Sequence, residues 1–388
     1  MIAFGIDILL QDSPPWKRAH IAFVTNDAAT TQKGISSRKA LLDNGFNIIK
    51  LFSPEHGLHA SGADGAFIQD GIDELTQLPI ISLYGAKLQP SKEDLKGIDI
   101  ILFDIPDSGV RFYTYLWTMT YVLEAAAAHG IPMVILDRPN PIGEDLHMAE
   151  GPMLDITCAS FIGRWNIPIT HSCTFGELAN YFNATRNIKA TLSTYACSTH
   201  DRKMQQPAWG LPFIPTSPAI QCFEAMQLYP GLCFLEATNL HEGRGTEFSF
   251  QSVAAPWLET DILKGLLQNM FEEELTIETI HFVSGSSTYE NELCNGLRFM
   301  VNDSASFKPV YFGFVLIKLI KDIHPNFFKW DTYKTNVNPT GNGHLDKLIG
   351  IENAGELFDL SFPLFLAKIT KAISVTPWKE DISKYLLY

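Results

Sequence analysis

The sequence predicts an α/β protein of two domains, the first of them built on a parallel β-sheet with helices on both faces. Its 388 residues exceed what one hydrophobic core usually organises, and a hydrophobic content of 46% is enough for two cores. Short β-branched runs alternate with helical patterns over the first part of the chain. These runs are apolar throughout, as is typical of strands buried on both faces.

The elements of the first domain follow one another in alternating order. Strands are expected at residues 20–24, 46–52, 79–83, 98–103 and 132–137. Helices are expected at residues 36–44 and 115–129, each followed by a glycine, Gly45 or Gly130, that ends it. The alternation of strands and helices predicts that neighbouring strands run parallel.

The second domain is expected to begin near residue 211. Residues 207–230 are rich in proline and aromatic side chains, which favours an irregular crossing between domains over a regular element. Beyond it, helices are expected at residues 261–274, 310–323 and 360–374, and a strand at 277–283. The prediction is therefore a first domain over residues 1–211 and a smaller α/β domain over 212–388.

Charge and cysteine usage limit the partners and the compartment. With 29 Lys and Arg against 43 Asp and Glu, the net charge of -14 argues against nonspecific binding to nucleic acid, and the most apolar stretch, residues 310–320, is too short for membrane insertion. Six dispersed cysteines without CxxC spacing and an N-terminus without a basic region favour the cytoplasm. A periplasmic or secreted location stays open if a signal peptide has been removed. A homodimer also stays open.

Polar residues gather directly after the predicted strands. In an open parallel sheet, ligands bind outside the carboxyl ends of the strands, so these loops are where a site is expected. The polar residues concerned are Asn26 and Asp27 after the first strand, Glu55 and His56 after the second, Asp104, Asp107 and Arg111 after the fourth, and Asp137, Arg138 and Asn140 after the fifth.

The motifs that the chain lacks narrow the chemistry. No GxGxxG follows the first strand, and GxxxxGK[ST], HExxH and GxSxG are all absent. We therefore expect no nucleotide cofactor, no metal and no serine nucleophile. The remaining equipment is carboxylates with arginines, which suits acid/base chemistry on a polar substrate such as a sugar.

Glu55 is the leading catalytic candidate in the first domain. It lies in Ser53-Pro54-Glu55-His56-Gly57, where proline and glycine fix the backbone beside two ionisable side chains. A helix cap or a structural ion pair explains the local pattern equally well. Of the two aspartates in the loop after the fourth strand, Asp104 is expected to order the loop and Asp107 to face the site.

Arginines and aromatic rings complete the expected binding surface. Arg111 and Tyr113 share one helix entry, a suitable floor for a sugar that carries a carboxylate, whereas Phe112 and Tyr115 are expected in the core. Asp137 is able to pair with Arg138, which leaves Asn140 to reach a ligand.

The second domain offers one further candidate cluster, Glu242, Arg244 and Thr246. The glycines on both sides of Arg244 allow close backbone approach to a carboxylate or phosphate, although a solvated turn with a surface ion pair has the same pattern. His171, expected to follow a short strand, is more often a structural histidine than a catalyst.

Taken in order, these motifs resemble the exo-β-N-acetylmuramidase family of peptidoglycan hexosaminidases, long catalogued as a domain of unknown function. The resemblance rests on residues 24–26, 53–57, 78–85, 103–115, 136–141, 174–179, 229–231, 242–246 and 385–388, so it covers essentially the whole chain. It implies a Rossmann-like, doubly wound first domain, a second α/β domain and an active site in the cleft between them.

The resemblance also implies a reaction, the release of non-reducing terminal N-acetylmuramic acid (MurNAc) from peptidoglycan-derived saccharides such as MurNAc-GlcNAc and muropeptides, without a cofactor. Glu55 stands at the family's proposed catalytic glutamate. Our hypothesis is that Glu55 protonates the glycosidic oxygen, assisted by His56, with Asp107 or Glu242 as base or nucleophile, unless the substrate's acetamido group takes that part.

Arg111 and Arg244 would bind the lactyl carboxylate of MurNAc. The other expected substrate contacts are Asn26, Tyr113, Asn140, His171 and Thr246.

Three departures from the family pattern bear on activity. The family usually has asparagine where this chain has Ala219, glycine where it has Ser172, and often serine where it has His241. Two alternatives therefore stay open at this stage. One is a muropeptide-binding protein that has lost turnover, and the other is a related hexosaminidase that prefers N-acetylglucosamine (GlcNAc).

Overall fold

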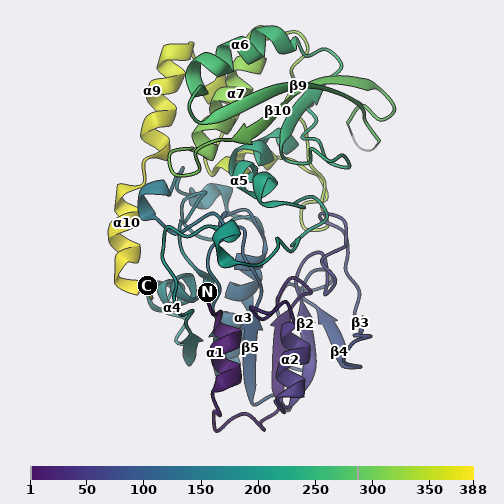
Figure 1. The fold of residues 1–388 in the computed structure, drawn as a ribbon, viewed down its shortest axis with the longest axis vertical. Helices are drawn as coiled ribbons and strands as arrows, with labels where there is room; N and C mark the ends of the chain where they lie inside the picture. The colour runs from purple at the N-terminus through teal and green to yellow at the C-terminus, as the bar shows by residue number, and fades with distance from the viewer. Residues whose placement is uncertain (1, 286–287) are drawn as a thin grey trace.

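The computed structural model describes residues 2–285 and 288–388, which form two sheets with helices around them (Figure 1). The larger sheet has the strand order β3-β4-β2-β1-β5-β6-β7, and the smaller has the order β8-β10-β9. Their bounds are β1 (Ile21–Thr25), β2 (Ile48–Ser53), β3 (Gly71–Ile72), β4 (Pro79–Ser82), β5 (Ile100–Asp104), β6 (Met133–Leu136), β7 (Leu192–Tyr195), β8 (Ser252–Ala255), β9 (Leu275–Val283) and β10 (Leu293–Val301). The expected α/β class, with a second and smaller sheet domain, is confirmed.

The larger sheet is parallel except at its edge, where β3 runs antiparallel to β4. Strand β1 is buried along its whole length, and its side chains alternate between two cores. Ala22 and Val24 belong to the core that contains α3 (Tyr115–His129) and α4 (Phe175–Thr185). Ile21 and Phe23 belong to the core on the other face, with α1 (Gly5–Gln11) and α2 (Ser37–Asp43). A sheet covered on both faces requires apolar strands, which is the pattern that the sequence shows.

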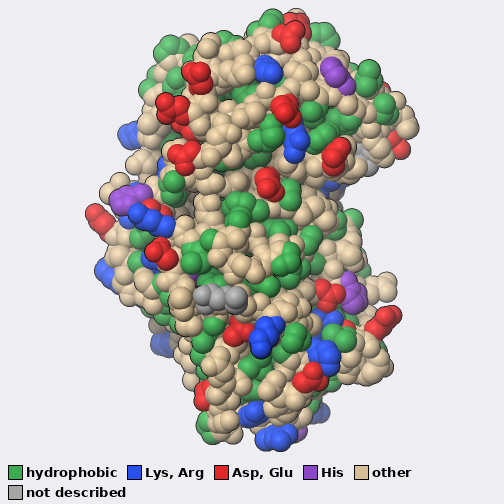
Figure 2. All heavy atoms as spheres, viewed as in Figure 1, with side chains coloured by type: hydrophobic (Ala, Val, Ile, Leu, Met, Phe, Trp, Pro, Cys, Tyr) green, Lys and Arg blue, Asp and Glu red, His purple; other side chains and the backbone are tan. Residues whose placement is uncertain are grey.

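The second domain combines the smaller sheet with helices. They are α5 (Phe223–Leu232), α6 (Thr260–Phe271), α7 (Pro309–Ile323), α8 (His344–Ile349), α9 (Phe362–Ile373) and α10 (Thr376–Ile382). Helices α5 and α7 meet at two glycines, because a Cβ on Gly313 would lie 2.5 Å from the Cα of Gly231. None of the described helices combines the length and the apolar character needed to cross a membrane. On the visible face, acidic and basic side chains are interspersed (Figure 2).

The end of the chain returns to the first domain. The indole Nε1 of Trp378 donates to the carbonyl of His171, 3.0 Å away. The Tyr388 hydroxyl donates to Oδ2 of Asp137, at 2.8 Å. These contacts, together with α10, tie the second domain to the first at a point remote from the smaller sheet (Figure 1).

Two expectations about local structure were wrong. Residues 223–230, expected to belong to an irregular crossing, lie in helix α5, with Pro230 inside it. Burial of Met226, Leu228 and Leu232 outweighs the backbone hydrogen bond that proline removes. The segment before His171 is not a strand, since Thr170 only makes isolated bridges to Val110 and Glu150.

Candidate functional site

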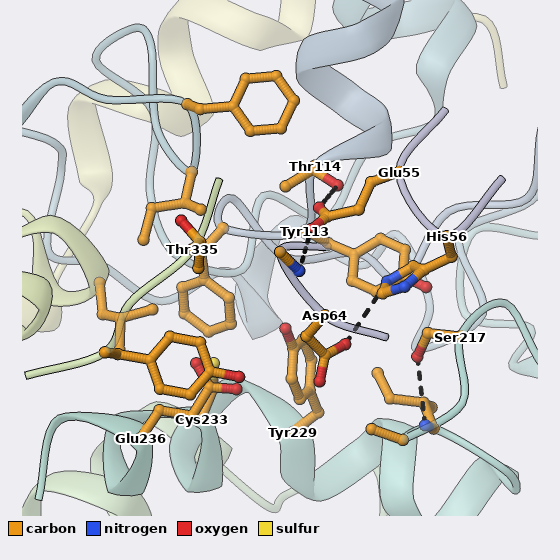
Figure 3. Close-up of a pocket in the computed structure, with 18 of the residues that line it drawn as sticks. Glu55, His56, Asp64, Tyr113, Thr114, Ser217, Tyr229, Cys233, Glu236 and Thr335 are labelled. Atoms are coloured by element: carbon orange, nitrogen blue, oxygen red, sulfur yellow. Dashed lines mark hydrogen bonds and ion pairs between the residues drawn. The ribbon is translucent and has the colours of Figure 1, made fainter. Parts of the chain in front are cut away.

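A cavity that opens to solvent lies between the two domains, with about 620 Å³ of space not filled by protein atoms (Figure 3). Both domains supply polar and aromatic side chains to its wall. Those from the first domain include Glu55, His56, Asp64, Tyr84, Tyr113 and Thr114, and those from the second include Tyr229, Glu236, Arg244, Tyr333, Thr335 and His344. Neither domain forms this cavity by itself.

Glu55 is fixed on the cavity wall by two donors from separate segments. Strand β2 ends at Ser53, and Glu55 follows after Pro54 with 7% of its surface exposed. The amide of Gly65 donates to its Oε1 at 2.9 Å, and the hydroxyl of Thr114, just before α3, donates to its Oε2 at 2.6 Å. Both bonds hold the carboxyl group in one orientation toward the cavity (Figure 3).

His56 lies beside Glu55 as a buried imidazole. Its Nδ1 is 2.8 Å from the carbonyl of Gly62, which can only accept, so Nδ1 carries a proton. Its Nε2 is 3.7 Å from Oδ1 of Asp64. Burial, with a smaller effect from Arg244, lowers the pKa of His56, which favours the neutral imidazole.

Arg244 forms the centre of an acidic cluster on the opposite wall. Its Nε lies 2.7 Å from Oε1 of Glu242, and its Nη2 lies 2.7 Å from Oε1 of Glu236. Its Nη1 is paired with Oδ2 of Asp64, which belongs to the first domain. Three carboxylates thus share one guanidinium, and one of those ion pairs joins the domains.

Burial changes the protonation of this cluster. It raises the pKa of Glu236 to about 8, with Glu55 adding to the effect, and it raises the pKa of Glu242 to about 7, with Glu236 adding to it. His344, whose Nε2 lies 3.1 Å from Oε2 of Glu236, has its pKa lowered by burial to about 4. At neutral pH the cluster therefore retains at least one carboxyl proton.

Four of the expected site residues line this cavity, namely Glu55, His56, Tyr113 and Arg244. Asn26, Asp107, Asn140, His171, Glu242 and Thr246, with Arg111, are not in its wall. Glu242 reaches the site only through Arg244. Thr246 closes a turn by donating to the carbonyl of Gly243 at 2.6 Å.

Arg111 has a structural place that does not fit the expected contact with a substrate. Its side chain is fully buried, and its Nη1 donates to the carbonyls of Pro152 and Ile167 at 2.7 and 2.9 Å. Its Nη2 donates to the carbonyls of Leu348 and Ile349, both at 2.8 Å, at the end of α8. These bonds join backbone of the two domains and leave no room for a substrate carboxylate.

Asp107 and His171 lie together, away from Glu55. Oδ2 of Asp107 is 3.2 Å from Nε2 of His171, and Asp107 lines a separate cavity of about 460 Å³ with Arg138 and Trp209. Asp107 is therefore poorly placed to act on a bond that Glu55 protonates.

Two further residues expected to contact the substrate, Asn26 and Asn140, form hydrogen bonds within their own loops. The Asn26 side chain accepts the amide of Ala28 at 3.2 Å, and the Asn140 side chain accepts the amide of Ile142 at 3.1 Å. Arg138 pairs with Asp104, as a loop-ordering aspartate should, and not with Asp137. Asp137 instead accepts the hydroxyl of Thr174 at 2.7 Å.

Sequence reasoning missed several residues of the cavity, above all Asp64 and Glu236. Glu236 lies in a short 3-10 helix, η4 (Cys233–Ala237), whose other side chains are buried apolar groups or cysteine. A lone carboxylate in so apolar a run is a usable signal, since burying it without a partner is costly. Tyr333 and His344 come from loop and helix ends with no comparable pattern.

The residues that the structure describes contain no group of three or more His, Cys, Asp or Glu side chains arranged to hold a metal ion. The cavity instead combines three carboxyl groups, Glu55 and Asp64 from the first domain and Glu236 from the second, with an arginine and several tyrosines. Carboxyl groups that face one another across an interdomain cavity suit the acid/base chemistry of carbohydrate-active hydrolases, and this is the class of protein that the site fits.

Comparisons with known proteins agree with this class. The family descriptions "Exo-beta-N-acetylmuramidase NamZ, N-terminal" and "Exo-beta-N-acetylmuramidase NamZ, C-terminal" match residues 21–224 and 227–388. The chain therefore belongs to the exo-β-N-acetylmuramidase NamZ family. It is 38% identical over 348 residues to the peptidoglycan β-N-acetylmuramidase NamZ of Bacillus subtilis (strain 168), covering 89% of this chain and 81% of that protein.

Two crystal structures of DUF1343 family proteins from Bacteroides fragilis NCTC 9343 have a similar fold. Both are 26% identical to this chain and cover 100% of it and 99% of their own chains, with TM-scores of 0.88 and 0.73. The family resemblance seen in the motifs is thus confirmed. The domain boundary near residue 211 stays a prediction.

Proposed function

We propose that this protein is an exo-acting glycoside hydrolase that releases non-reducing terminal MurNAc from peptidoglycan fragments. The observation that carries the proposal is the placement of Glu55, held by two hydrogen bonds on the wall of a cavity that the second domain closes with Glu236 and Arg244. The activity named for the 38% identical relative from Bacillus subtilis supports it.

In this mechanism Glu55 donates the proton to the glycosidic oxygen. Its orientation depends on Gly65 and Thr114, which lie on different segments and do not need to move for the carboxyl group to face the cavity. His56, neutral because it is buried, adds no positive charge that would oppose protonation of its neighbour. General acid catalysis of this kind contributes about 10²–10⁴-fold to the rate.

Glu236 is the second carboxyl group, in place of Asp107 and Glu242. It lines the same cavity as Glu55, whereas the other two do not. Glycoside hydrolysis needs one protonated and one charged carboxyl group, and Glu55 and Glu236 are the two glutamates in the wall of this cavity.

The anomeric configuration of the first product shows which role Glu236 has in the reaction. Inversion at the anomeric carbon means that it activates water as a base. Retention means that it acts as nucleophile or orients the substrate's acetamido group.

Arg244 is the proposed ligand of the lactyl carboxylate, which distinguishes MurNAc from GlcNAc. It is the described arginine that lines the cavity, and a guanidinium fork suits a carboxylate. The rings of Tyr113 and Tyr229 meet edge to face with centroids 6.1 Å apart and line the same wall, which gives the sugar an apolar surface.

The test uses defined saccharides and follows the products by mass spectrometry. MurNAc-GlcNAc should give free MurNAc, and the same disaccharide extended by GlcNAc at its non-reducing end should resist cleavage. Tight binding of muropeptides without sugar release would favour a non-catalytic binding protein. Equal turnover of chromogenic MurNAc and GlcNAc substrates would favour a general hexosaminidase.

A further inference from the structure

Asp64 stands apart from the other carboxylates around Arg244. It comes from the loop after β2, in the first domain, whereas Glu236 and Glu242 belong to the same domain as Arg244. About 28% of the Asp64 side chain is exposed, against 10% and 9% for the two glutamates. Asp64 is thus the partner of Arg244 that water and a ligand reach most easily.

All three nitrogens of the Arg244 guanidinium already have a carboxylate partner. Nε pairs with Glu242, Nη2 with Glu236, and Nη1 with Asp64. A fourth carboxylate can bind there only if one of the three gives up its place. The three carboxyl groups, of which at least one is protonated at neutral pH, offset the positive charge of the guanidinium, so an anionic ligand gains little there as long as all of them stay.

We propose that Asp64 occupies, in the free protein, the position on Arg244 that the lactyl carboxylate of MurNAc takes in the complex, and that the substrate binds by exchanging one carboxylate for the other. The inference rests on the proposed function and adds a specificity-determining residue to it. The exchange breaks the Asp64–Arg244 ion pair and forms a substrate–Arg244 ion pair, so the guanidinium is never left buried without a partner.

The exchange makes the affinity for MurNAc, and not that for neutral sugars, depend on Asp64. MurNAc has to displace Asp64 from Arg244, so the resident carboxylate weakens its binding to the wild type. GlcNAc has no carboxylate to offer Arg244 and leaves the Asp64–Arg244 ion pair in place.

The backbone beside Asp64 stays in place during the exchange. The carbonyl of Gly65 accepts the amide of Asn336 at 2.8 Å, and its own amide holds Glu55. Gly65 has a φ of +65°, and a Cβ there would lie 2.6 Å from Cβ of Thr335. Asp64 therefore leaves by rotation of its side chain toward solvent, and Glu55 keeps its orientation.

The opposite role for Asp64 is that of a permanent support that orients Arg244 for the substrate. The two roles predict opposite effects of neutralising it. If Asp64 competes with the substrate, the Asp64→Asn variant binds MurNAc more tightly. If Asp64 supports Arg244, the same variant binds MurNAc more weakly.

The experiment is calorimetric titration of the wild type and of Asp64→Asn with three ligands: MurNAc, its methyl ester and GlcNAc. Glu74→Gln is the matched control, because it removes one exposed charge from the same domain at a residue outside the cavity wall. We expect Asp64→Asn to bind MurNAc roughly two- to fivefold more tightly, since exposed ion pairs are of that strength. The affinities for the methyl ester and for GlcNAc should differ much less between Asp64→Asn and the wild type. Glu74→Gln should bind all three ligands with the affinities of the wild type.

Unchanged or weaker MurNAc binding by Asp64→Asn would overturn the exchange. So would equal tightening for MurNAc and its ester, since that gain would not depend on the carboxylate. If the wild type hydrolyses MurNAc-GlcNAc while the exchange fails, only this inference falls. If neither form binds MurNAc, the proposed function falls with it.

Discussion

Replacing Arg111 by methionine tests whether this buried arginine joins the two domains or binds the substrate. The side chain donates to four carbonyls, two in each domain. The carbonyl of Ile167 also accepts the amide of Leu154, at 3.2 Å, so it keeps a partner in the variant. The carbonyls of Pro152, Leu348 and Ile349 each lose a charged donor in a dry environment.

The cost follows from these three carbonyls. At about 1–1.5 kcal/mol for each buried acceptor that loses its donor, Arg111→Met should lower the free energy of unfolding by about 3–5 kcal/mol. Urea denaturation followed by circular dichroism measures this loss. Arg298→Met, at a half-exposed arginine whose Nη1 is 3.9 Å from Glu278, is the matched control and should cost less than about 1 kcal/mol.

The kinetic result separates the two roles of Arg111. Because the side chain does not line the cavity, Arg111→Met should leave the ratio of KM values for chromogenic MurNAc and GlcNAc substrates unchanged. A variant as stable as Arg298→Met with KM raised for the MurNAc substrate alone would refute the reasoning and return Arg111 to the substrate-binding set.

Three further predictions concern the cavity and the domain interface. Glu236→Gln should lower kcat on MurNAc-GlcNAc by roughly 10²-fold or more, whereas Glu242→Gln, at a residue behind Arg244, should lower kcat less than tenfold. Equal losses of kcat in the two variants would contradict a catalytic role for Glu236 alone. Gly65→Ala should lower kcat at least tenfold because the new Cβ meets Thr335. The control Gly34→Ala, where φ is +73° and the space around the residue is open, should leave kcat unchanged and cost only about 1 kcal/mol of stability. Similar kcat values for both variants would show that Gly65 does not position the site. Burial raises the pKa of Glu150 from 4.5 to about 7, so the stability that its protonated form supports is complete below pH 4.5 and lost as pH rises to about 7. In urea denaturation at several pH values, Glu150→Gln should reduce this fall in the free energy of unfolding. The same pH dependence in the variant and the wild type would contradict the prediction.

Much of the fold could be predicted because the first domain is regular. Strands β1, β2, β4, β5 and β6 lie within one to two residues of the expected ranges at most of their ends, since strands buried on both faces are apolar throughout. Helix α3 has the expected bounds because Gly130, in a left-handed conformation, ends it.

The elements missed were those whose sequence pattern conflicts with their structure. Helix α5 contains Pro230 and Gly231, which normally indicate a break, and only burial against α7 makes it a helix. Strand β10 pairs along its length with β9, the strand before it in the sequence, but Asn295, Gly296 and Arg298 interrupt its apolar pattern.

The candidate site was predictable where side chains follow strands directly. Glu55 and His56 come straight after β2 and do line the cavity. Asp107 and Asn140 also follow strands, yet they face other cavities or their own loops, because the carboxyl edge of the sheet is wider than one site. Glu236, Tyr333 and His344 enter from the second domain, and their position depends on how the domains dock.

The most direct test of the account is the rate at which Glu55→Gln releases MurNAc from MurNAc-GlcNAc, measured beside its affinity for free MurNAc. Glutamine keeps one oxygen to accept the amide of Gly65, and its amide nitrogen donates to the Thr114 hydroxyl in the reverse direction, but it has no acidic proton to give the glycosidic oxygen. We therefore expect kcat to fall by about 10²–10⁴-fold while MurNAc affinity and the urea midpoint stay near those of the wild type. A variant that retains kcat within tenfold of the wild type would contradict the assignment of Glu55 as the proton donor.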